Sequence, residues 1–254
     1  MLIDDAGTPD QLAAMIERRV AGLPLEQILG WAEFRGLRIA LDPRVFVPRR
    51  RTEFLVEQAV ALLRRATGDA TPPAVVVDLC CGSGAVGVAL AAVLNPIELH
   101  AVEIDPVAVR CAARNLAPVG GRVYHGDLYD PLPAALRGRI DLLAVNAPYV
   151  PTGDISLMPP EARLHEPQVA LDGGPDGLDI QRRVAAGAPG WLAPGGHLLI
   201  ETSERQQPTT AAIFTGSGLL TGVARSEDFD ATVVIGTRPR PAARRAGTTA
   251  RRPG

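Results

Sequence analysis

Apolar residues recur at helical spacing in two segments before residue 74. Residues 52–65 carry an apolar stripe on one helical face, formed by Leu55, Val56, Ala59, Leu62 and Leu63. A shorter stripe of Leu12, Met15, Ile16 and Val20 follows Thr8-Pro9-Asp10-Gln11 and ends at Gly22. A capping Thr, a Pro at the first helical position and a Gln three residues after the cap are typical of a helix start. Between the two stripes, residues 33–41 alternate loosely and predict a hairpin that turns at Arg35-Gly36.

From residue 74 onward, short apolar runs alternate with helical segments. This alternation predicts a parallel sheet with right-handed crossovers, and hence an α/β fold. We expect seven strands, near residues 75–79, 97–102, 121–125, 140–145, 196–201, 218–224 and 231–236. The predicted organisation is a short N-terminal helical segment (1–30), a hairpin linker (31–51), a Rossmann-like domain (52–237) and a disordered Arg-rich tail (238–254).

Composition narrows the class of protein. At 254 residues and 46% hydrophobic, the chain suits one α/β domain with a small appendage. No uninterrupted apolar stretch reaches membrane-spanning length, and residues 1–10 lack a signal-peptide pattern. Three cysteines, two of them adjacent, form no disulfide framework and have no partners at metal-ligand spacing. We therefore expect a cytoplasmic protein with no membrane contact and no metal site.

The distribution of charge adds two points. All 26 basic residues are arginine, which excludes Schiff-base chemistry and phosphate loops that depend on a lysine. Residues 237–254 contain six arginines and no acid, whereas twenty arginines and 28 acidic residues precede them, a balance of −8. The tail is therefore a candidate for weak electrostatic contact with RNA or the ribosome, or a solvated terminus without a role.

A glycine-rich turn after the first core strand indicates a nucleotide-containing ligand. Cys80-Cys81-Gly82-Ser83-Gly84 lies between the apolar run 74–79 and the apolar helix 85–94. Glycines in such a turn let a ligand approach the backbone, and Glu103, at the end of the next strand, is placed to bond ribose hydroxyls. Asp78 would repel a pyrophosphate but attract an ammonium or sulfonium group, which favours S-adenosyl-L-methionine over a dinucleotide. Asp127, after the third core strand, is a candidate for the adenine amino group or a plain loop carboxylate.

The tetrapeptide Asn146-Ala147-Pro148-Tyr149 predicts the chemistry. It follows the strand-like run 140–145, and open α/β sheets bind ligands at the carboxyl ends of their strands. An amide oxygen, a rigid turn and an aromatic ring together suit a planar NH2 group. We expect Asn146 and the Ala147 carbonyl to accept its two N–H groups, Tyr149 to pack on its plane and Pro148 to hold the turn.

Several separate segments between Glu17 and Thr237 resemble the HemK-type protein-(glutamine-N5) methyltransferases, which modify peptide chain release factors. The matching segments are Pro24 to Gly30 with Glu33-Phe34, Val47-Pro48-Arg49 with Thr52-Glu53, Asp78 to Gly84, Asn146 to Tyr149, Glu166-Pro167, Ala170-Leu171, and Gly173-Gly174-x-Asp176-Gly177-Leu178.

This resemblance implies the sheet of the class I S-adenosylmethionine-dependent methyltransferases, with an antiparallel final strand, and a protein acceptor with an exposed glutamine. It implies donor contacts at Asp78, Cys80, Gly82, Gly84, Glu103, Ile104, Asp127, Leu128 and Asn146. Acceptor contacts are implied at Arg49, Glu166 and Pro167, although Arg49 could equally brace the linker and Glu166-Pro167 a loop.

The chain departs from the family pattern in three places. Ala147 and Arg50 stand where the family has proline, and only about two dozen residues precede the linker, where family members have a multi-helix lobe. Three alternatives stay open at this point: methylation of a nucleic-acid amino group, methylation of a small molecule, and donor binding without catalysis. An acidic body without a further recognition domain argues against a nucleic-acid acceptor.

Overall fold

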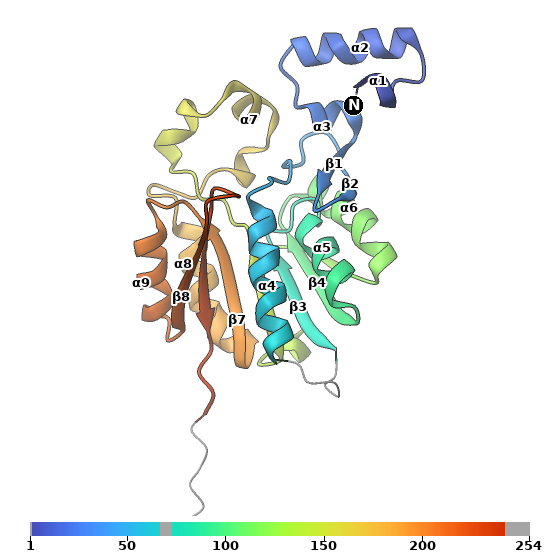
Figure 1. Cartoon of the computed structure of the whole chain (residues 1–254). Helices are drawn as coiled ribbons and strands as arrows, with labels where there is room; N and C mark the ends of the chain where they lie inside the picture. Colours follow the sequence, from blue (N-terminus) through green and yellow to red (C-terminus); the bar gives the residue numbers. More distant parts are fainter. Residues whose placement is uncertain (1, 67–72, 242–254) are drawn as a thin grey trace, which may run out of the picture.

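A seven-stranded sheet with helices on both faces forms the centre of the computed structural model, which describes residues 2–66 and 73–241 (Figure 1). The strand order is β5-β4-β3-β6-β7-β9-β8, and β9 alone runs opposite to the other six strands. The strands are β3 (Ala74–Leu79), β4 (Ile97–Glu103), β5 (Arg122–His125), β6 (Ile140–Val145), β7 (Leu192–Thr202), β8 (Leu220–Ser226) and β9 (Ala231–Thr237). The predicted α/β class and its seven strands are confirmed.

Alternation along the strands distributes side chains between two apolar layers. Val76 packs with the helices α4 (Thr52–Ala66), α5 (Ala85–Leu94) and α6 (Pro106–Leu116). Its neighbours Val75 and Val77 face the opposite layer with α8 (Asp179–Trp191) and α9 (Gln207–Gly216). The central strands are therefore buried on both faces, which explains why β3 and β6 read as nearly continuous apolar runs.

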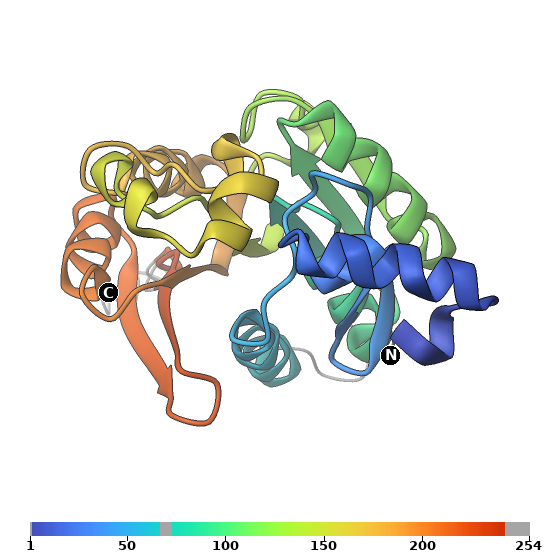
Figure 2. The same ribbon diagram turned by 90° about the horizontal axis from the view of Figure 1, so that it is seen from above.

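Short elements complete the described chain, several of them around the carboxyl edge of the sheet. Seen from above, the N-terminal helices and the segment 151–171 both lie over that edge (Figure 2). These elements are α1 (Leu2–Asp5), α3 (Leu25–Leu29), β1 (Trp31–Phe34), β2 (Leu37–Ala40), α7 (Pro160–His165), and the 3₁₀ turns η1 (Ala117–Val119), η2 (Ala134–Leu136), η3 (Thr152–Leu157) and η4 (Gln168–Ala170).

The predicted N-terminal helix and hairpin form, but the apolar face of the helix is not buried as its pattern predicts. Helix α2 (Pro9–Val20) begins as expected, with the Thr8 hydroxyl accepting the Gln11 N–H at 3.2 Å. The hairpin β1–β2 turns at Arg35 and Gly36, both with positive φ. The apolar stripe of α2 is not part of the core, since no residue of this helix is buried and Val20 is 83% exposed.

Strand boundaries differ from the prediction at two turns that contain glycine. Strand β7 begins at Leu192, because Gly195 lies in a left-handed turn within the extended segment rather than before it. Strand β8 begins at Leu220, because Gly218, with φ +81°, closes the turn that follows α9. The Arg-rich tail lies outside the described residues from 242 onward. Within the described part of the chain, every helix is too short or too polar to cross a bilayer.

Candidate active site

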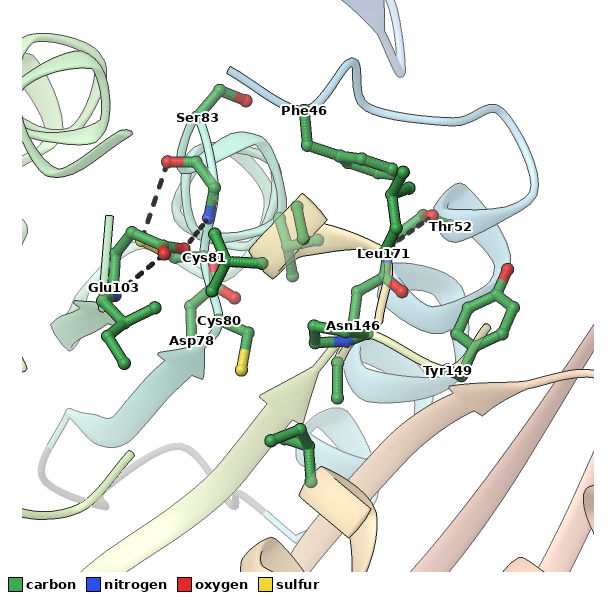
Figure 3. Close-up of a pocket in the computed structure, with 18 of the residues that line it drawn as sticks. Phe46, Thr52, Asp78, Cys80, Cys81, Ser83, Glu103, Asn146, Tyr149 and Leu171 are labelled. Atoms are coloured by element: carbon green, nitrogen blue, oxygen red, sulfur yellow. Dashed lines mark hydrogen bonds between the residues drawn. The ribbon is translucent and has the colours of Figure 1, made fainter. Parts of the chain in front are cut away.

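The chain changes direction across the sheet at β3, and this switch point opens a cavity. Strand β3 pairs in parallel with β4 on one side and with β6 on the other, so their carboxyl ends lie side by side. The cavity lies at this edge (Figure 3). The predicted site residues that line it are Arg49, Asp78, Cys80, Gly82, Glu103, Ile104, Asp127, Leu128, Asn146, Ala147, Pro148 and Tyr149. Gly84, Glu166 and Pro167 are not among its lining residues.

Two glycines of the loop 80–84, the donor loop that the family resemblance implies, have different tasks. Gly82 has φ +54°, and a Cβ built on it would meet no atom within 4 Å, so its open side faces the cavity. Gly84 has φ +79°, and a Cβ there would lie 3.1 Å from Leu116 Cδ1 on α6. Gly82 therefore leaves room for a ligand, whereas Gly84 allows α5 and α6 to pack closely.

Asp78 is a buried carboxylate beneath this loop. It is 2% exposed, and its Oδ2 accepts the Gly87 N–H in the first turn of α5 at 3.0 Å. Burial raises the pKa of Asp78 to about 7, and repulsion from Glu103 adds to this effect. The helix N–H offsets part of the cost of burying the charge, and a cation in the cavity would stabilise it further.

Glu103 ties the donor loop to the end of β4. Its carboxylate accepts N–H groups from Gly82 at 2.8 Å, Ile104 at 2.8 Å and Asp105 at 3.0 Å (Figure 3). A carboxylate has about four lone-pair positions, so one remains for a ligand hydroxyl. Burial raises the pKa of Glu103, while the three N–H groups act in the opposite direction.

The charges along the cavity favour a cationic ligand. Each arginine that lines it is paired with a carboxylate: Arg49 with Glu166 at 2.6 Å, Arg51 with Glu201 at 3.2 Å, and Arg183 with Asp127 at 2.7 Å. Within the described residues, Asp78 and Glu103 form no such ion pair. The surplus of negative charge disfavours a pyrophosphate and fits a ligand with ammonium and sulfonium groups.

The side chain of Asn146 is held by a residue at the start of α4. Its Nδ2 donates to the hydroxyl of Thr52, the first residue of α4, at 3.2 Å (Figure 3). Ala147 is 2% exposed and packs in the apolar layer of α8 and α9. The Arg51 guanidinium lies 5.7 Å from the centre of the Tyr149 ring. The turn is therefore supported by the segment 49–52, which precedes it by nearly a hundred residues.

The segment 171–178 also supports the turn 146–149 and the residue that follows it. Val150 donates its N–H to Leu171 O at 3.0 Å and accepts the Gly173 N–H at 2.9 Å. Gln206 Nε2 donates to the Tyr149 carbonyl at 2.9 Å and to the Asp176 carbonyl at 3.0 Å. Gly177 lies so close that a Cβ built on it would be 2.3 Å from Tyr149 O. The glycine-rich segment thus shapes the backbone on which Asn146 and Tyr149 are carried.

Contacts at Arg49 and Glu166 bear on the alternative that the sequence left open. Glu166 is 6% exposed, and its Oε1 accepts from Arg49 Nη2 at 2.6 Å and from the Val47 N–H at 3.3 Å. These contacts favour the bracing role, in which Glu166 holds the linker over the cavity. Arg49 also lies over the Phe46 ring, 4.9 Å from its centre.

Sequence reasoning missed several residues of the site. Arg183 reaches Asp127 from α8, 56 positions away, and no local pattern reveals that pair. The sequence indicates Thr52 only as part of a motif. Its position as the first residue of an amphipathic helix after the linker could also have marked it as a site residue. Glu201 was missed too, but a carboxylate at the end of a predicted core strand is itself a sign of a site.

Comparison with known proteins shows which family this chain is similar to. The profile of the methyltransferase small domain matches residues 53–174. A release factor glutamine methyltransferase of Geobacter sulfurreducens is 41% identical over 215 residues, covering 83% of this chain and 72% of that protein. A 4-amino-L-phenylalanine/4-methylamino-L-phenylalanine methyltransferase of Streptomyces pristinaespiralis is 37% identical, covering 83% and 71%.

A solved structure supports the fold. A methyltransferase of Pyrococcus furiosus superposes with a TM-score of 0.57 at 15% identity, covering 89% of this chain and 98% of that one. On the strength of the sequence similarity, the chain belongs to the family of release factor glutamine methyltransferases, the HemK-type enzymes whose motifs it carries.

Proposed function

We propose that this protein binds S-adenosyl-L-methionine in the cavity and methylates the side-chain amide nitrogen (N5) of a glutamine in a peptide chain release factor. One observation carries the proposal: Asn146, held by Thr52, and the donor loop at Gly82 line the same cavity at the ends of adjacent strands. A methyl donor and an NH2 acceptor bound there would be neighbours.

The donor side of the proposal rests on the carboxylates and the open loop. Bound S-adenosyl-L-methionine supplies an electrophilic methyl group on a sulfonium. Asp78 offers negative charge to its cationic end, Glu103 offers an acceptor to ribose hydroxyls, and Asp127, oriented by Arg183, accepts from the adenine amino group. Cys80, Ile104 and Leu128 line the cavity between these groups, and Cys80 and Leu128 have positive φ values of 57° and 48°.

The acceptor side explains how a weak nucleophile reacts. An amide nitrogen shares its lone pair with the carbonyl, so the enzyme must align the nitrogen and localise that pair. Asn146 Oδ1 accepts one N–H and the Ala147 carbonyl accepts the other, while Tyr149 packs on the amide plane. Alignment of this kind is worth up to ~7–11 kcal/mol in ideal cases. The proton leaves after methyl transfer, so no general base is needed beforehand.

A protein acceptor is supported by the surface beside the cavity. The segment 151–171 exposes Leu157 at 81%, Leu164 at 66% and Val169 at 47%, and Val169 and Leu171 also line the cavity. Exposed apolar side chains next to a site are typical of surfaces that contact another protein. Within this proposal the protein acts in the cytoplasm, where its three free cysteines stay reduced.

The experiment is a transfer assay with isotope-labelled donor and purified release factor. We expect label in the release factor and, by peptide mass spectrometry, the mass of one added methyl group on a glutamine. Total RNA and duplex DNA serve as parallel acceptors. Label in nucleic acid with an unmodified release factor would overturn the proposal.

A second candidate acceptor is a small arylamine. It is favoured by the Streptomyces pristinaespiralis relative, whose name gives 4-amino-L-phenylalanine as its substrate and which is nearly as similar to this chain as the glutamine methyltransferases. An aromatic amine also presents a planar NH2 group. Adding 4-amino-L-phenylalanine to the assay distinguishes the two candidates, because only one acceptor should reach turnover at micromolar concentration.

A further inference from the structure

Asn115 lies on α6 and is not among the residues that line the cavity, yet its side chain joins two segments of the site. Its Oδ1 accepts the N–H of Ala40, the last residue of β2, at 3.0 Å, and its Nδ2 donates to the Ala40 carbonyl at 2.8 Å. The same Nδ2 donates to the carbonyl of Ser83 in the donor loop at 2.8 Å. Both amide hydrogens and the oxygen of Asn115 are therefore engaged, which fixes the orientation of the side chain.

In the donor loop, Asn115 holds a peptide group that the following helix leaves without a partner. The Gly87 N–H bonds to Asp78 at 3.0 Å, so it does not close a helical turn onto the carbonyl of Ser83, four residues earlier. Within the described residues, the Ser83 carbonyl accepts from Asn115 alone. Ser83 is 3% exposed and lines the cavity, so the position of its peptide group shapes the cavity wall.

At the other end, Asn115 fixes the point from which the segment 41–51 leaves the hairpin. Apolar residues of this segment pack against α6, and several of its residues line the cavity. The Ala40 carbonyl also accepts from Cys111 Sγ at 3.2 Å, so the hairpin keeps a contact with α6 when the Asn115 amide is removed. The Ser83 carbonyl has no such second partner within the described residues. Loss of Asn115 should therefore disturb the donor loop more than the hairpin.

We propose that Asn115 is a positioning residue for the methyl donor, which couples the donor loop to the segment 41–51. This inference rests on the proposal that the cavity binds S-adenosyl-L-methionine. Asn115 acts without touching the methyl donor: it holds the Ser83 peptide group in place before the methyl donor binds, which lowers the cost of ordering the loop. Because one amide holds both segments, binding that orders the donor loop also orders the segment 41–51.

The test compares three variants by titration calorimetry with S-adenosyl-L-methionine. Asn115→Ala removes all three hydrogen bonds of the side chain. Asn115→Asp keeps its size and an acceptor for the Ala40 N–H, but it loses both N–H groups. Arg114→Gln is the matched control from the same helix, because Arg114 pairs with Asp42 of the segment 41–51 at 2.9 Å. Within the described residues, the side-chain hydrogen bonds of Arg114 reach Asp42 and Cys111 and not the donor loop.

The loss should appear in the affinity for the methyl donor. We expect the Kd to rise roughly 3-fold to 10-fold in Asn115→Ala, as for the loss of one hydrogen bond. The Kd should rise at least as much in Asn115→Asp, whose oxygens would face the Ser83 carbonyl with no hydrogen to share. At saturating methyl donor, kcat should stay within about twofold of the wild type, because the proposed acceptor contacts remain. Arg114→Gln should bind the methyl donor as the wild type does, and urea unfolding checks that each variant is folded in the assay.

Hydrogen exchange followed by mass spectrometry separates coupling from a general contribution to stability. In the wild type and in Arg114→Gln, saturating methyl donor should slow amide exchange both in the donor loop and in the segment 41–51. In Asn115→Ala it should slow exchange in the donor loop alone.

Three results would overturn the inference: a Kd within twofold of the wild type in both Asn115 variants, protection of the segment 41–51 that persists in Asn115→Ala, or no protection of that segment in the wild type. The last result needs no variant, so it decides the matter even if the Asn115 variants do not fold. A wild type that binds no methyl donor would refute the proposed function and this inference together, whereas normal binding by the wild type and both Asn115 variants would refute the inference alone.

Discussion

Thr52 and Asn146 are 94 positions apart, yet the Thr52 hydroxyl accepts a hydrogen bond from the side-chain amide of Asn146 at 3.2 Å. The contact joins the start of α4 to the end of β6, across the apolar layer that buries Leu55 and Leu142. It links the linker segment to the turn that carries the proposed acceptor contacts. Disturbing either end should therefore affect methyl transfer before it affects donor binding.

Removing the Asn146 side chain separates these two effects. Asn146→Ala should lower kcat roughly 100-fold or more, as the loss of a preorganised polar contact does in other enzymes. Donor Kd should change little, because the carboxylates of the donor loop remain. Isothermal titration with the donor and single-turnover kinetics measure the two quantities. Equal losses in kcat and donor affinity would contradict the role given to Asn146.

Replacing Gly177 tests whether the segment 171–178 shapes the turn. Gly177→Ala places a Cβ 2.3 Å from Tyr149 O at a residue with φ +78°, so the backbone must shift. We expect a loss of about 1–3 kcal/mol in the free energy of unfolding, as for other overpacked sites, and a lower kcat. Urea unfolding measures the first. Gly153→Ala is the control, because its Cβ would meet nothing within 4 Å, and it should leave both quantities unchanged.

Glu103 should determine donor affinity. Glu103→Gln replaces an oxygen that accepts backbone N–H groups with an NH2 group that opposes them. We expect donor binding to weaken by about 1.5–3 kcal/mol, the range for a hydrogen bond to a charged group. Equilibrium dialysis with labelled donor measures the change. A donor Kd equal to that of Glu204→Gln, a control variant at an exposed residue, would contradict the role of Glu103.

Asp78 should make donor binding depend on pH. Its pKa is about 7 in the folded protein, and a cationic donor favours the ionised form. Affinity should therefore rise as pH increases from about 6 to about 8, and binding near pH 7 should release protons. Titration calorimetry in buffers of different ionisation enthalpy measures that release. Asp78→Asn, which can still accept the Gly87 N–H, should remove most of the pH dependence.

The same pKa has a consequence for stability. An Asp carboxyl ordinarily has a pKa of 3.8, well below the value of about 7 that Asp78 has in the folded protein. Between these pH values the folded state holds a proton that the unfolded state has lost, so stability falls as pH rises through the window and levels off above it. Urea unfolding at several pH values should show a smaller decline in Asp78→Asn than in the wild type.

The sequence by itself determined the layers of the fold and predicted the location of the candidate site. Apolar runs of strand length that alternate with helical stripes force a covered parallel sheet, because each buried face needs a partner. The carboxyl ends of such strands meet at one edge, so the sequence alone predicts that Asp78, Glu103 and Asn146 lie close together. Local rules also specified the start of α2 at Thr8 and the hairpin turn at Arg35-Gly36, since those depend on neighbours in the chain.

Only the tertiary structure decided which groups pair across the site. Arg183 with Asp127, Arg49 with Glu166 and Arg51 with Glu201 join elements that are 56, 117 and 150 positions apart. Such pairs leave no periodic signal, because each depends on the packing of two separate elements and not on local backbone preference. The exposure of the α2 stripe has the same cause: an apolar face is visible in sequence, but whether another element covers it is a property of the assembled fold.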